Sequence, residues 1–354
     1  MLELSTNDKK QLEGLNISVE QVEKQVNQFR TGFPYSDLIA PATIGNGIVK
    51  FSDTEVQELI KQFDEDKQYY DILKFIPASG AASRMFKNIY SFIEEYKGKE
   101  IPEDFLRKEN IKADSIESFF INIRDFAFYD DLKNKMAECD KDINTLLNEN
   151  KLVDIAEFLL ENKGLGYGKL PKALLKFHKY KETSRYALEE HLVEAAQYST
   201  ADTEEGIVAQ LHFTVSQEHL NIFKKVVEEV VPRYEEQFGI RYDISYSVQK
   251  PSTDTVAVDM NNEPFRNNDG SLLFRPGGHG ALIQNLNDLH KEIIFIKNID
   301  NVVPDRLKPT TYDYKKVLGG YLFKLQQQQF EYLNLLDEGC LVDDELDEIA
   351  KFAK

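Results

Sequence analysis

Apolar and polar positions near the start of the chain follow the period of a helix. Apolar residues recur at helical spacing after two capping pairs, Ser18 with Gln21 and Ser52 with Glu55. Such pairs satisfy the free N–H groups at the start of a helix. Residues 1–66 are therefore predicted to form a helical N-terminal segment.

The period changes at residue 72. Residues 72–76 form a short apolar run followed by turn residues, which indicates a buried strand. Residues 86–162 show only helical periodicity and are predicted to form a helical insertion. Further strands are predicted over 212–216, 242–248, 254–259, 272–275 and 293–297.

Strands that alternate with helices indicate the α/β class, with a mostly parallel sheet whose faces are covered. The sheet and its insertion are assigned to an α/β domain over residues 67–305. A helical segment over 306–354 follows, in which no further strand is visible.

Composition limits the possible partners. The 354 residues include 43 Lys and Arg against 61 Asp and Glu, a net charge of −18. This charge argues against a general nucleic-acid binder or a protein of anionic membranes, because both need a basic surface. No apolar run is long enough to span a membrane, and the polar start lacks the apolar region of a signal peptide. A cytoplasmic protein is expected, and its oligomeric state is left open.

The loop after the first core strand is a candidate phosphate site. Small side chains let a backbone approach phosphate, and a helix N-terminus presents N–H groups to it. An arginine here could bind a di- or triphosphate. The alternative is a plain turn with an exposed arginine. The candidate residues are Ala78, Ser79, Gly80, Ala81, Ser83 and Arg84.

Two further candidates supply opposite charges. Lys172 follows Pro171 and could hold a phosphate, or it could be a solvated lysine. Asn298 and Asp300 directly follow the last predicted strand, at the strand end where ligands bind in open α/β sheets. Such oxygens suit Mg²⁺, which proteins usually hold with one or two carboxylates plus substrate phosphates. An Asx-rich turn is the alternative.

A glycine-rich loop surrounds one histidine. Gly277, Gly278 and Gly280 flank His279 and permit positive φ and close approach of a flat ring such as a nucleobase. The alternative is a tight turn. The other five histidines are predicted on helix or strand surfaces: His178, His191, His212, His219 and His290.

These segments together resemble a known group of enzymes. Residues 78–85 resemble the signature loop of GT-A-fold nucleotidyltransferases, and residues 171–175 resemble their Pro-Lys motif. Gln249-Lys250-Pro251 resembles their base-recognition strand end. Residues 276–280 and 298–301 resemble more narrowly the UDP-sugar pyrophosphorylases. The whole chain also resembles the bacterial domain-of-unknown-function family 4301, which implies no activity.

The resemblance implies a GT-A-like three-layer α/β/α sandwich and transfer of a nucleotide from a nucleoside triphosphate to a sugar phosphate. In this interpretation the nucleotide binds to the loop at 78–83. The matching positions imply the remaining roles. Arg84 would neutralise the leaving pyrophosphate, Lys172 would hold a phosphate, and Asp300 would hold Mg²⁺. The base would be contacted by Gln249, Gly277 and Gly278, and the substrate by His279 and Asn298.

The departures from the pattern keep other functions open. Ser79 and Ala82 stand where the signature loop usually has glycine, so a triphosphate would sit differently. A non-catalytic nucleotide- or sugar-nucleotide-binding protein on the same fold is the first alternative, and a helical interaction protein is the second. For the enzyme we expect Gly80, Arg84, Lys172, Gln249, Gly278 and Asp300 to line one cleft, with the helical insertion beside it.

Overall fold

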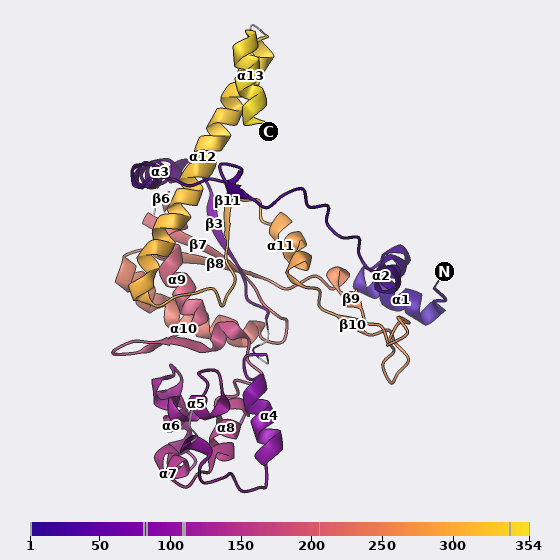
Figure 1. Ribbon diagram of the computed structural model, residues 1–354, viewed down its shortest axis with the longest axis vertical. Helices are drawn as coiled ribbons and strands as arrows, with labels where there is room; N and C mark the ends of the chain where they lie inside the picture. Colours follow the sequence, from indigo (N-terminus) through magenta and orange to yellow (C-terminus); the bar gives the residue numbers. More distant parts are fainter. Residues whose placement is uncertain are drawn as a thin grey trace.

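A computed structural model describes residues 2–80, 82, 84–107, 111–204, 206–339 and 341–353. The chain forms a mixed α/β structure, which confirms the predicted class (Figure 1). In the described part, no helix is both long enough and apolar enough to cross a bilayer.

The principal sheet is mixed, and β3 lies at its centre. β3 pairs in parallel with β11 and with β7, and β7 also pairs in parallel with β8 and antiparallel with β6. The carboxyl ends of four strands therefore meet at one edge. The strands are β3 (Ile72–Pro77), β6 (Thr200–Thr203), β7 (Gly206–Thr214), β8 (Arg241–Ser247) and β11 (Ile293–Ile296).

Helices cover one face of this sheet. Ile76, Leu211 and Phe213 of the sheet share a buried apolar core with side chains of α9 (Ala187–Tyr198) and α10 (Leu220–Phe238). Phe63 of α3 (Asp53–Asp66) and Phe323 of α12 (Lys308–Glu338) pack on Ile72 in a second core. On the opposite face, α11 (Ile283–Asn287) hydrogen-bonds to the end of β8. The three-layer GT-A arrangement stays a prediction.

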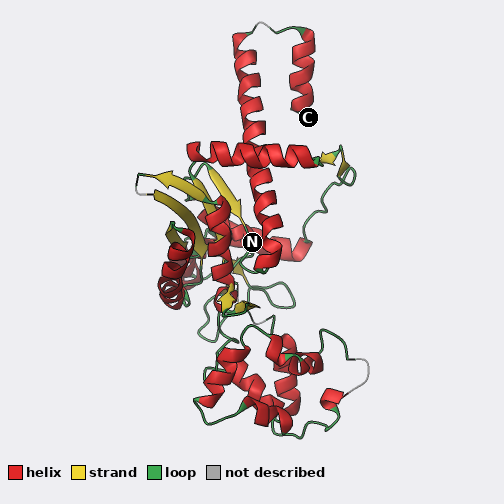
Figure 2. Cartoon of the chain, turned by 90° about the vertical axis from the view of Figure 1, so that its left-hand side faces the viewer, coloured by secondary structure: helices red, strands yellow, loops and turns green. Residues whose placement is uncertain are grey.

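The range predicted as a helical insertion contains helices and no strand in its described residues. Its apolar side chains form their own core around Phe92, Phe120, Leu132 and Leu159. Figure 2 shows these helices as a separate group at one end of the molecule. They are α4 (Lys87–Tyr96), α5 (Ile116–Ile121), α6 (Tyr129–Ala137), α7 (Ile143–Asn148) and α8 (Leu152–Leu160).

The N-terminal helices do not pack as one group. α1 (Thr6–Leu15) and α2 (Val19–Thr31) share a small core with Val256 and Leu272 near β9 (Thr255–Val256) and β10 (Phe274–Arg275). α3 instead lies across α12, as Figure 2 shows. The predicted strands at 254–259 and 272–275 thus pair with each other and not with the principal sheet. The domain boundaries at residues 66 and 305 remain predictions.

The remaining elements are short or peripheral. The C-terminal α13 (Asp343–Phe352) forms a hairpin with the far end of α12 that projects from the body (Figures 1 and 2). Two small strand pairs were not predicted: β1 (Thr43–Ile44) with β2 (Gly47–Ile48), and β4 (Lys176–Lys179) with β5 (Ser184–Tyr186).

Candidate active site

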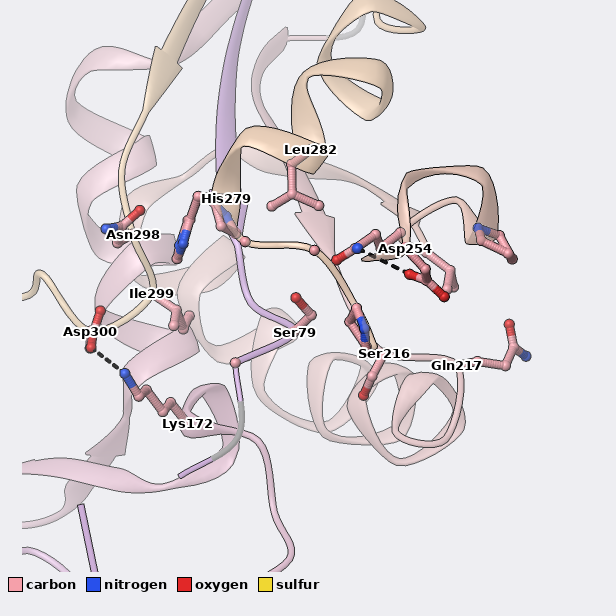
Figure 3. A pocket seen from close by; sticks show the side chains of 18 residues that line it. Ser79, Lys172, Ser216, Gln217, Asp254, His279, Leu282, Asn298, Ile299 and Asp300 are labelled. Atoms are coloured by element: carbon pink, nitrogen blue, oxygen red, sulfur yellow. Dashed lines mark hydrogen bonds and ion pairs between the residues drawn. The ribbon is translucent and has the colours of Figure 1, made fainter. Parts of the chain in front are cut away.

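A cavity of about 460 Å³ lies at the carboxyl edge of the principal sheet (Figure 3). Loops that follow β3, β7, β8 and β11 all contribute to it, as the strand-end rule for open α/β sheets predicts. The residues that line it are Pro77, Ser79, Gly80, Lys172, Ser216, Gln217, Val248, Gln249, Pro251, Asp254, Pro276, Gly277, Gly278, His279, Leu282, Asn298, Ile299 and Asp300.

An ion pair marks one end of the cavity. Nζ of Lys172 lies 2.6 Å from Oδ2 of Asp300, and both side chains are partly exposed. The backbone N–H of Lys172 donates to the carbonyl of Gly80 at 3.2 Å, and the N–H of Ile299 reaches the carbonyl of Pro77 at 3.4 Å. The main chain itself therefore joins the loop after β3 to the segments that carry Lys172 and Asp300.

The local charges keep Asp300 ionised. The hydrogen bond from Lys172 lowers the pKa of the Asp300 carboxyl below its usual value, and the positive charge of Lys172 acts in the same direction. Burial opposes this shift but does not outweigh it. This end of the cavity thus presents a carboxylate and an ammonium group side by side.

Amide and carboxylate groups mark the other end. Nε2 of Gln249 lies 3.3 Å from Oγ1 of Thr253 and 3.5 Å from Oδ1 of Asp254. Burial raises the pKa of the Asp254 carboxyl. Figure 3 shows Asp254 on the opposite side of the cavity from the Lys172–Asp300 contact.

Positive φ does not explain the glycines of this loop, which corrects one of the two reasons expected for them. Gly277, Gly278 and Gly280 are not among the glycines with positive φ. A Cβ on Gly277 would lie 2.8 Å from the carbonyl oxygen of Thr253, which is too close, whereas a Cβ on Gly278 would project into open space. Gly278 therefore leaves room beside the cavity wall.

Most of the predicted site residues come together. Ser79, Gly80, Lys172, Gln249, Gly277, Gly278, His279, Asn298 and Asp300 all line the cavity. Ala78 does not, because its side chain is buried in the core against α9. Arg84 is exposed and is not a lining residue, so the expectation that it shares the cleft is wrong for this structure. Ala81 and Ser83 lie outside the described residues.

Three polar lining residues were not predicted from the sequence. Ser216 and Gln217 follow the carboxyl end of β7, so the strand-end rule could have identified them. Asp254 lies five residues after Gln249 in a short turn, and no sequence signal placed it in the cavity.

Two histidines that were predicted on the surface are buried. His191 of α9 and His212 of β7 are 0% and 3% exposed. His212 is held between the hydroxyls of Ser245 and Ser247, each at 2.8 Å. Helical spacing alone did not reveal that α9 is buried on several sides.

A buried charge cluster on α9 supports the turn that carries Asp300. Glu194 accepts hydrogen bonds from Lys74 at 2.9 Å and Lys297 at 2.6 Å. The neighbouring His191 donates from Nε2 to the carbonyl of Ile299 at 3.1 Å. Burial holds the pKa of His191 well below its usual value, so the ring is neutral. These contacts fix the strand end directly before Asp300.

The donors around Asp300 suit a metal only in part. Within the described chain, no group of three or more His, Cys, Asp or Glu side chains could hold a metal ion. Asp300 and Asn298 offer oxygen atoms at the cavity wall. Mg²⁺ accepts such a partial protein site when substrate phosphates complete its coordination.

Comparisons with known proteins give a family and a distantly similar solved structure. No curated protein matches the chain. Among solved structures, the uridine diphosphate N-acetylglucosamine pyrophosphorylase from Trypanosoma brucei, in complex with an inhibitor, aligns with a TM-score of 0.48 and 13% identity. The alignment covers 91% of this chain and 50% of that chain, so this chain spans about half of its length. The model of the family described as domain of unknown function (DUF4301) matches residues 5–354, and the chain therefore belongs to this family.

Proposed function

We propose that the protein is a nucleotidyltransferase of the sugar 1-phosphate type, which forms a nucleoside diphosphate sugar and pyrophosphate on a GT-A-like fold. One observation carries the proposal. Three groups of residues converge on one cavity at the strand ends: the Lys172–Asp300 pair, the loop at Ser79–Gly80, and Gln249 with Gly277 and Gly278. The first two suit phosphates, and the third suits a nucleobase.

In this reaction an oxygen of the sugar phosphate attacks the α-phosphorus of the triphosphate. The bond from that phosphorus to the bridging oxygen breaks, and pyrophosphate leaves with the electron pair. No general base is needed, because the attacking phosphate is already anionic. The protein contributes position and charge neutralisation. Lys172 would hold a phosphate oxygen, and Gly80 and Gly278, which have open space where a Cβ would be, would let the ligand approach the backbone.

We further propose Mg²⁺ as the cofactor, held by Asp300 with Asn298 beside it. When bound, the ion would supply positive charge to the phosphates. Asp300 now pairs with Lys172. A bound phosphate would attract Lys172 and repel Asp300, so the pair would open as the carboxylate turns to the cation.

A non-catalytic nucleotide-binding protein is the second candidate, and a specific observation favours it. Arg84, the residue expected to neutralise the leaving pyrophosphate, is exposed and does not line the cavity. Binding needs no such group, whereas transfer does.

The experiment is a screen for pyrophosphate release over the common nucleoside triphosphates and sugar 1-phosphates with Mg²⁺. Release that needs both substrates supports the transferase. Nucleotide binding in a parallel thermal-shift assay, without release for any pair, supports the binding protein. No stabilisation by any nucleotide would contradict both.

A further inference from the structure

We propose that the cavity selects guanine nucleotides and that Asp254 is the residue that determines this choice. The inference rests on the proposed function, since it assumes that a nucleotide occupies the cavity. It names a base that the resemblance to UDP-sugar enzymes does not suggest.

The Asp254 carboxylate has no cation to balance it among the described residues. Within the described chain it takes part in no ion pair, although it lies partly buried in the cavity wall. Its side-chain partner there is Nε2 of Gln249, a neutral amide at 3.5 Å. A partly buried carboxylate with one weak neutral partner retains acceptor capacity for a ligand.

The donors and acceptors around Asp254 have a definite order. Nε2 of Gln249 is directed at Asp254 and Thr253, which leaves Oε1 as a further acceptor. On the adjoining loop, the backbone N–H groups of Gly277 and Gly278 have no acceptor among the described residues. The wall thus offers acceptors on one side and main-chain donors on the other.

The hydrogen-bonding edge of guanine matches this order better than those of the other bases. Guanine carries two adjacent N–H donors, N1–H and the 2-amino group, beside the acceptor O6. A carboxylate can accept from both donors at once, as it does from arginine. In uracil a carbonyl flanks N3–H on each side, and in adenine and cytosine a ring nitrogen acceptor flanks the amino group. Each of these three bases would place one of its own acceptor atoms against a carboxylate oxygen, and the two acceptors would repel each other.

The position of Asp254 agrees with this role. It lies at the end of the cavity away from the Lys172–Asp300 pair (Figure 3). A nucleotide whose phosphates face Lys172 would bring its base to Gln249 and Asp254. Gly277 lies beside Thr253 and Gln249, so it and Gly278 would border the nucleoside.

The test compares ligands that differ by one group. ITP is GTP without the 2-amino group, so calorimetric titration of the full-length wild type with GTP, ITP, UTP and ATP in Mg²⁺ needs no mutation. We expect GTP to bind most tightly, and ITP at least about tenfold more weakly, because a site built for a donor rejects an analogue that lacks it. In Asp254→Asn, GTP and ITP should bind within about twofold of each other. The asparagine amide has one neutral acceptor oxygen, so the second charged oxygen that accepts from the 2-amino group is lost.

Asp202→Asn is the matched control. Asp202 is exposed on β6, at the opposite end of β7 from the cavity, and its replacement changes the net charge by the same amount. It should retain the wild-type preference for GTP over ITP.

The outcomes separate this inference from the proposed function. Equal affinity for GTP and ITP in the wild type, or a preference for UTP, overturns the guanine assignment and leaves nucleotide binding intact. Equal weakening of all four ligands by Asp254→Asn places Asp254 against the ribose and also overturns it. If no nucleotide binds to the wild type, the proposed function fails as well.

Discussion

Nζ of Lys172 lies 2.6 Å from Oδ2 of Asp300, although 128 residues separate them in the sequence. Lys172 begins a 3₁₀ turn after Pro171, and Asp300 follows the edge strand β11. Because β11 and β3 run in parallel, Asp300 after β11 and the loop after β3 lie at the same edge of the sheet. The backbone N–H of Lys172 donates to Gly80 of that loop, which brings Lys172 to the same edge. The group proposed to hold a phosphate thus lies directly against the group proposed to hold the metal.

Replacement of Asp300 by asparagine should abolish the Mg²⁺ dependence of nucleotide binding and stop turnover. The fold should lose no more than about 1 kcal/mol, because the ion pair that is removed is partly exposed to solvent. The measurement is nucleotide affinity with and without Mg²⁺, with Asp313→Asn on the exposed surface of α12 as control. Unchanged Mg²⁺ dependence in Asp300→Asn would refute the metal assignment.

Replacement of Lys172 by alanine should weaken nucleotide binding by about tenfold or more, since a charged hydrogen bond to phosphate is lost. Lys169→Ala, on the same segment but exposed and not a lining residue of the cavity, should have no effect. Both variants lose one positive charge, so a difference between their affinities reports the position of Lys172. Similar affinities would indicate that Lys172 is a solvated lysine that does not contact the phosphates.

The two glycines at the cavity should respond differently to alanine. Gly277→Ala should lower the free energy of unfolding by about 1–3 kcal/mol, because its Cβ would lie 2.8 Å from a backbone oxygen. Gly278→Ala meets open space and should change stability by no more than about 0.5 kcal/mol. Its methyl group should nevertheless weaken nucleotide binding. Denaturant unfolding and calorimetry measure the two effects, and equal stability of the two variants would contradict this packing.

The buried cluster on α9 should make stability depend on pH in acid. Burial acts to raise the pKa of Glu194, but the positive charges of Lys74 and Lys297 and the hydrogen bond from Lys297 lower it below its usual value of 4.5. Below pH 5, Lys74 carries its charge, although burial lowers its pKa to about 7. A depressed carboxyl pKa stabilises the fold fully above the unfolded value, and this contribution is lost as the pH falls through the folded value.

Glu194→Gln should therefore lower the free energy of unfolding by about 3–5 kcal/mol at neutral pH, because it leaves Lys74 buried without a counter-charge. It should also lose less further stability than the wild type as the pH falls from 5 to lower values. Melting temperatures across this range measure both effects. Glu58→Gln, on the exposed side of α3, serves as control. A steeper acid loss in Glu194→Gln than in the wild type would contradict the depressed pKa of Glu194.

The sequence by itself determined the local elements and half of the residues that line the cavity. The short apolar run at 72–76 is the central strand β3, and Ser18 and Ser52 cap their helices as predicted. Small residues, glycines and Asx residues at predicted strand ends identified lining residues such as Ser79, Gly278 and Asp300. These properties depend on side-chain period and on neighbours within a few residues, so the order of residues is sufficient to reveal them.

Only the tertiary structure decided which of these residues meet. It paired Lys172 with Asp300, brought Asp254 to Gln249 and left Arg84 outside the cavity. It also buried His191 beneath the strand end, where its hydrogen bond to Ile299 fixes the segment before Asp300. The physical reason is that burial and ion pairing depend on the register of strands and the packing of helices far apart in the chain. Periodicity along one segment carries no information about either.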